Sequence, residues 1–182
     1  MARQFPALTP ELTAFIARQP IFFTATAAPG ARVNISPREG AALRVPSPNL
    51  ACYLDQTGSG SETAAHLIAD GRITLMLCAF QGPPMILRLY GRGTSLLRGT
   101  PDYAALLAAH YAGQEPPGAR QIVRILVELV QTSCGYGVPL FEHLGDRDTL
   151  RDWATRKGED GLLAYRAEKN AASIDGLPTD WA

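Results

Sequence analysis

The feature that most constrains the fold is a pair of long apolar segments joined by a short turn. Residues 72–80, RITLMLCAF, are almost continuously apolar, which predicts a strand that is buried on both sides. The residues QGPP then turn the chain, and residues 85–97, MILRLYGRGTSLL, read as a second long strand. The glycines of this second strand predict a bulge or a sharp bend. Together the two segments indicate a β-rich core.

Further segments with β-branched and aromatic residues surround this pair. Pro37 is expected to end one of these strands, and Pro29–Gly30 to form a turn. Residues 120–134 have a spacing that also permits a helix, but their β-branched content and the GYG that follows favour a strand. The other expected strands are 21–27, 32–36 and 49–55.

Helices are expected between the strands. Thr9 followed by Pro10 is typical of a helix start, with Leu12, Phe15 and Ile16 on one face and an end before Pro20. Gly71 suits the left-handed residue that closes a helix. The other expected helices are 62–70 and 101–112.

The order of these elements favours a small antiparallel barrel in an α+β protein. No GxGxxG or Walker pattern follows a strand, which disfavours the Rossmann and P-loop folds. From Gly145 the composition becomes charged and helical. We therefore divide the chain into a barrel domain, 1–144, and a helical C-terminal extension, 145–182, which packs on the barrel or on a dimer partner.

Composition and charge exclude several function classes. The 182 residues carry 17 basic and 17 acidic side chains without a run of Lys or Arg, which argues against nucleic acid as a partner. No apolar stretch approaches the roughly 20 residues that span a bilayer, so no membrane association is expected. The N-terminus lacks the pattern of a signal peptide. The three cysteines are widely spaced and match no metal site, which indicates reduced thiols and a cytoplasmic location.

The segment DQTGSGSETAAHL, residues 55–67, allows two interpretations. In the first, Ser59 and Glu62 form a capping box at the start of a helix, or Ser61 is the cap, and no ligand is needed. In the second, the helix start binds a phosphate through its unpaired N–H groups and partial positive charge. Hydroxyl groups such as that of Thr63 add donors, and Arg38 supplies a guanidinium that fits a phosphate.

Five motifs follow one another in a specific order: VNISPREG, ACYLDQTGSGSETAAHL, GRITLMLCAFQGPPMILRLYGRG, SCGYGVP and KNAASIDGLP. In this order they resemble the pyridoxamine 5′-phosphate oxidase-like FMN-binding family, and within it a bacterial and fungal subgroup. The resemblance covers roughly Leu8 to Pro178. It implies a split β-barrel with flanking helices that forms a homodimer, with FMN in a cleft at the subunit interface.

The resemblance also implies roles for individual residues. The strand 33–36 would run beside the flavin ring, Arg38 would face the phosphate, and 59–66 would wrap the phosphate and the ribityl chain. Arg88 would reach the cofactor from the partner subunit. The implied cofactor-binding residues are Asn34, Ile35, Ser36, Arg38, Ser59, Gly60, Ser61, Glu62, Thr63, His66 and Arg88.

One departure from the family concerns the substrate. Vitamin-oxidising members carry an Arg–Lys pair in the loop, where this chain has Glu62 and Thr63. Pyridoxamine phosphate is therefore disfavoured as the substrate. As a lone histidine, His66 is more readily explained by packing or capping than by a place beside the flavin, and Cys134 by burial as a small apolar group.

The sequence thus predicts an FMN-binding oxidoreductase that acts on a small molecule of unknown identity. No catalytic residue stands out, as expected where the flavin carries the chemistry. The alternatives are a flavin carrier without turnover, the same barrel with a deazaflavin or haem, and an interaction module whose loop is only a helix cap.

Overall fold

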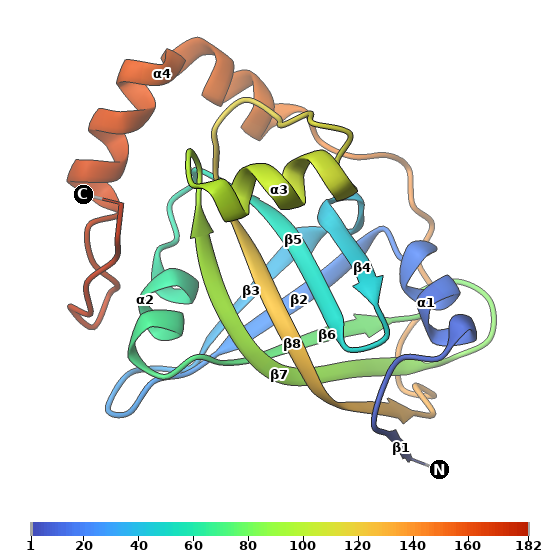
Figure 1. Cartoon of the computed structure of the whole chain (residues 1–182). Coiled ribbons are helices and arrows are strands. Elements are labelled where there is room, and N and C mark those ends of the chain that lie inside the picture. The colour runs from blue at the N-terminus through green and yellow to red at the C-terminus, as the bar shows by residue number, and fades with distance from the viewer. Residues whose placement is uncertain (1, 182) are drawn as a thin grey trace.

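The structure, a computed structural model, describes residues 2–181 and is built around one curled antiparallel sheet (Figure 1). Seven strands follow one another in the order β3-β2-β6-β7-β8-β5-β4, and β1 pairs with β8. The strands are β1 Arg3–Phe5, β2 Ile21–Thr26, β3 Asn34–Glu39, β4 Leu43–Ser47, β5 Leu50–Gln56, β6 Arg72–Cys78, β7 Ile86–Leu97 and β8 Ala119–Ser133. The fold is the split β-barrel of the α+β class, as predicted.

Four α-helices and one short 3-10 helix, η1, connect or follow the strands. They are α1 Pro10–Ala17, η1 Gly40–Ala42, α2 Glu62–Ala69, α3 Pro101–His110 and α4 Thr149–Lys169. Figure 1 shows α3 lying across one end of the sheet, with α2 at one side and α1 at the other. None of the helices among residues 2–181 is long and apolar enough to cross a membrane.

The predicted hairpin forms β6 and β7, in which Leu75 pairs with Leu89. The expected bulge lies in β7, where the register with β8 shifts between Tyr90 and Gly91. A Cβ at Gly91 would lie 2.0 Å from the carbonyl oxygen of Leu126, so only glycine fits there. The prediction that β6 is buried on both sides is wrong in part. Every second side chain is buried, whereas Thr74 and Met76 on the other face are only partly covered.

Strand β3 differs from the prediction at both ends. It begins at Asn34, and Pro37 lies inside it rather than ending it. Proline lacks the N–H that a central strand needs, but β3 is an edge strand that pairs only with β2, so one side of its backbone needs no partner. Strands β1 and β4 were not predicted.

The predicted start of α1 and the predicted end of α2 are confirmed. Thr9 Oγ1 accepts a hydrogen bond from the N–H of Leu12 at 3.3 Å, and the predicted apolar face of α1 is buried. Gly71, with φ at +86°, follows the end of α2. Helix α3 ends at His110, two residues before the predicted end.

The ambiguous segment is the strand β8, which lies inside the sheet and pairs with β1, β5 and β7. The main core lies inside the curl, where the fully buried ring of Phe22 packs edge-on against Tyr53 with centroids 5.4 Å apart. A second, smaller cluster joins α3 to the outer face of the sheet around Tyr103 and Ile122.

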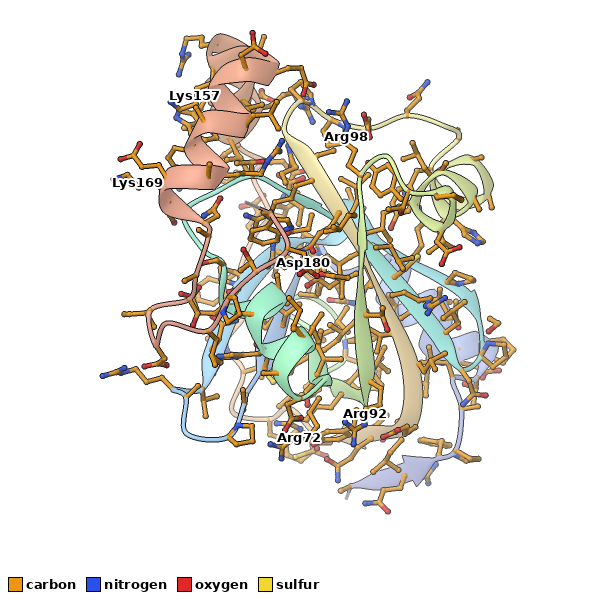
Figure 2. The ribbon with its side chains drawn as sticks, turned by 60° about the vertical axis from the view of Figure 1, so that its left-hand side comes forward. Arg72, Arg92, Arg98, Lys157, Lys169 and Asp180 are labelled. Carbon is orange, nitrogen blue, oxygen red and sulfur yellow. The ribbon has the colours of Figure 1, made fainter. Side chains whose placement is uncertain are left out.

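Helix α4 packs against the barrel of its own chain at Gly118. A Cβ on Gly118 would lie 3.0 Å from Cβ of Ala154, and Gly118 has φ at +82°, so both space and backbone require glycine there. After α4 the chain turns back toward the sheet, and Figure 2 shows Asp180 between α4 and α2. The boundary between 1–144 and 145–182 stays a prediction.

Candidate functional site

The start of α2 is held by the C-terminal tail instead of by a capping box. Ser61 is the N-cap residue, but its hydroxyl donates to the carbonyl oxygen of Ala172 at 2.8 Å. The carboxylate of Glu62 accepts the N–H of Ser61 at 3.0 Å. Ser61 thus has the alternative position expected for the cap, and the predicted box between Ser59 and Glu62 is wrong because Ser59 lies two residues before the cap.

A small cavity of about 20 Å³ opens at this helix start. Six of the predicted cofactor-binding residues line it: Ser36, Arg38, Gly60, Ser61, Glu62 and Thr63. Three further residues complete the wall: Ala64, Arg120 and Trp181. The structure therefore gathers in one place the β3 end, the glycine-rich loop and the first turn of α2.

Asp55 forms ion pairs with two arginines that line this cavity. It is fully buried and forms an ion pair with Arg38. Its carboxylate also accepts hydrogen bonds from Nε of Arg120 at 2.7 Å and from Nε2 of Gln121 at 2.8 Å. Burial alone would raise the pKa of Asp55, but the guanidiniums of Arg120 and Arg38 together lower it below its ordinary value. Asp55 is therefore an anion at neutral pH and holds both arginines in place.

Asp55 supplies one negative charge to two guanidiniums, and the carboxylate of Glu62, which also lines the cavity, supplies a second. A third arginine, Arg166 of α4, is also buried and donates to Thr57 Oγ1 at 3.0 Å. Burial lowers the pKa of Arg166, and repulsion by Arg120 and Arg98 lowers it further despite the nearby Glu159. A buried surplus of positive charge is costly unless an anion accompanies it.

A polar network ties the β2–β3 hairpin to α2 next to the cavity. Asn34 Nδ2 donates to Thr63 Oγ1 at 3.2 Å and to Thr26 Oγ1 at 3.3 Å, and Ser36 Oγ donates to Asn34 Oδ1 at 3.3 Å. His66 Nδ1 lies 3.0 Å from Thr26 Oγ1. The ring of His66 is fully buried, so Asn34 and His66 position the loop from within the protein.

The remaining predicted residues do not line this cavity. Ile35 is 66% exposed on β3, and Ser59 is exposed in the loop. Arg88 lies in β7 and donates to Ser133 Oγ at 3.3 Å. Whether Arg88 meets a cofactor across a dimer interface stays a prediction.

A much larger groove, with a volume of about 960 Å³, adjoins the cavity at Arg38. Its walls come from the end of α1, the end of β3, the β6–β7 turn and residues 141–147, and they include Phe80 and Phe141, whose rings lie 5.6 Å apart. Arg38 lines both spaces. The arrangement can hold an anion at the helix start and a larger, partly apolar group beside it.

The chain is similar in sequence to one family of known proteins. Residues 8–134 match the family model described as pyridoxamine 5′-phosphate oxidase. A pyridoxamine 5′-phosphate oxidase family protein of Aspergillus flavus, ustO, is 33% identical over 192 residues, which cover 96% of this chain and 76% of the relative.

Two solved structures share the fold at low sequence identity. A variant of HupZ from Group A Streptococcus has a TM-score of 0.56 at 18% identity, and the match covers 69% of this chain and 98% of that one. A putative pyridoxamine 5′-phosphate oxidase from Lactobacillus delbrueckii has a TM-score of 0.54 at 18% identity, covering 69% and 94% of the two chains.

Proposed function

Because the chain belongs to the pyridoxamine 5′-phosphate oxidase family, we propose that it binds FMN and acts as an oxidoreductase on a small molecule. The observation that carries this proposal is the pair of arginines at the start of α2, Arg38 and Arg120, which share the carboxylate of Asp55. A phosphate monoester is the anion that such a site fits.

The described residues fit the phosphate group chemically. Arg38 is ion-paired through Nη1 alone, and its buried Nε has no hydrogen-bond partner within residues 2–181. The first N–H groups of α2 and the hydroxyl of Thr63 add donors on the opposite wall. We assign the phosphate to these groups and the flavin ring to the groove on the other side of Arg38.

When bound, the flavin would supply the redox chemistry, by exchanging a hydride or electrons with the substrate. The chain then has to bind and orient the cofactor and to limit access of water. The hydrogen bonds of Asn34 and His66 hold the loop in place, and the ring of Tyr53 lies under Arg38, 5.2 Å from Cζ. Burial raises the pKa of Tyr53 to about 12, so its hydroxyl stays protonated at neutral pH.

We also propose that two copies of the chain associate. The extended segment 134–148 exposes large apolar side chains, among them Tyr136 at 82%, Leu140 at 76% and Leu144 at 90%. Exposed apolar side chains gathered on one segment are typical of a protein interface. The three cysteines are free thiols, two of them buried, which supports the proposed cytoplasmic location.

The first test is a titration of the purified protein with FMN, followed by desalting and an assay for turnover. The proposal expects FMN to remain bound and to be reduced by NADH or NADPH in the presence of an acceptor. Bound FMN without turnover across a panel of acceptors would support the carrier instead. A protein that does not retain FMN would contradict the proposal.

A further inference from the structure

The C-terminal strap, which we define as residues 170–181, lies across the loop that precedes α2 in the same chain. Asn170 Nδ2 donates to the carbonyl oxygen of Gly58 at 3.1 Å. The N–H of Ile174 donates to the carboxylate of Glu62 at 3.3 Å. With the bond from Ser61 to the strap, these contacts fasten it over the predicted phosphate site, and Figure 2 shows it returning between α4 and α2.

Arg120, the second residue of β8, connects the strap to the site. It is 6% exposed, and besides its ion pair with Asp55 it donates Nη2 to the carbonyl oxygen of Gly60 at 3.0 Å. Its Cζ lies 3.9 Å from the centre of the Trp181 ring. A guanidinium this close to an indole is a cation–π contact, which holds the planar group in one orientation.

Two observations indicate that this pair serves a ligand. A guanidinium has five N–H donors, and the protein partners of Arg120 leave some of them unused. The indole Nε1 of Trp181 is buried without a hydrogen-bond partner in the part of the chain that the structure describes. Both residues line the small cavity.

The anion now at this place is the carboxylate of Glu62, which lines the cavity and is held by the N–H groups of Ser61 and Ile174. A cavity of about 20 Å³ holds at most a water molecule, not a phosphate. An incoming phosphate must therefore displace the Glu62 side chain. Displacement of Glu62 also breaks one of the bonds that fasten the strap.

We propose that Arg120 and Trp181 bind the phosphate of the flavin in the same subunit. They thereby set the preference for FMN over riboflavin, which lacks the phosphate. The inference rests on the proposed function, because it assumes that a flavin binds. Arg120 supplies the charge and the fork-shaped donor, and Trp181 orients it and adds its indole N–H.

The test compares the affinities of FMN and riboflavin by calorimetry for the wild type and for Trp181→Ala. We expect Trp181→Ala to weaken FMN binding about tenfold, equivalent to about 1.4 kcal/mol, and to leave riboflavin binding within about twofold. The matched control is Trp153→Ala on α4, because the ring of Trp153 packs on Tyr165 and does not line the cavity. This control should change neither affinity.

Arg120→Lys is a second variant, which keeps the positive charge beside Asp55 and loses the forked donor. It should also reduce the ratio of the FMN affinity to the riboflavin affinity. Equal losses for both flavins in either variant, or no loss, would overturn the inference while the flavin site remained. A wild type that binds neither flavin would instead refute the proposed function.

Discussion

Replacing Asp55 by Asn should destabilise the protein more than most single substitutions. Asn has the same shape but no charge, so the two guanidiniums that Asp55 holds lose their shared anion. Removing one partner of a buried ion pair typically costs about 3–5 kcal/mol. At roughly 2–4 °C per kcal/mol for a chain of this size, the melting temperature should fall by about 6–20 °C.

The loss of stability in Asp55→Asn should depend on pH in a direction that the pKa of Asp55 sets. The pKa of Asp55 is lower in the folded protein than its ordinary value, so its stabilising effect is present above that ordinary value, near pH 4. The effect is lost as the pH falls through the depressed folded pKa. The difference in unfolding free energy between the wild type and Asp55→Asn should therefore be largest near neutral pH and shrink in acid.

Chemical denaturation of both proteins from pH 7 down to pH 3 would measure this difference. Inorganic phosphate should also raise the melting temperature of Asp55→Asn more than that of the wild type, because the variant has a larger surplus of positive charge. If Asp55→Asn were as stable as the wild type at pH 7, the reasoning that Asp55 binds both arginines as their anion would be refuted.

Three further predictions concern single side chains. Glu62→Gln should tighten FMN binding about fivefold, or roughly 1 kcal/mol, because no carboxylate then opposes the phosphate, and riboflavin affinity is the control. Gly118→Ala should lower the free energy of unfolding, measured by chemical denaturation, by more than about 1 kcal/mol, because Gly118 has φ at +82° beside Ala154. It should also make α4 more sensitive to protease. Unchanged stability would contradict the proposed close packing. Leu144→Ser should weaken the proposed dimer, so light scattering at micromolar concentration should show a smaller mass than for the wild type. A wild type that is itself a monomer would exclude this interface.

Local sequence patterns predicted the elements whose causes are local. The Thr9–Pro10 start, the Gly71 end and the apolar β6–β7 pair depend on neighbouring residues, and the structure contains all of them. Pro37 was misread because the rule that proline ends a strand does not hold at a sheet edge, and the edge position follows only from the strand order. The short strands β1 and β4 have too few residues for a clear alternation.

The lining of the small cavity was predictable in part. Motif order placed Arg38 and the loop 59–63 together, and the structure brings most of these residues to one cavity. Arg120 and Trp181 were missed because each reaches the cavity from a distant part of the chain. A basic residue that opens a strongly apolar strand, as Arg120 opens β8, was the available signal.

The most direct test of the central claim is the absorption spectrum of the protein after addition of FMN and desalting, with Arg38→Ala and Ser61→Ala measured beside the wild type. If the start of α2 holds the phosphate, the wild type retains the flavin bands and both variants lose much of them. If the desalted wild type is colourless, the loop is only the start of a helix, and the family shares its fold with this chain but not this cofactor site.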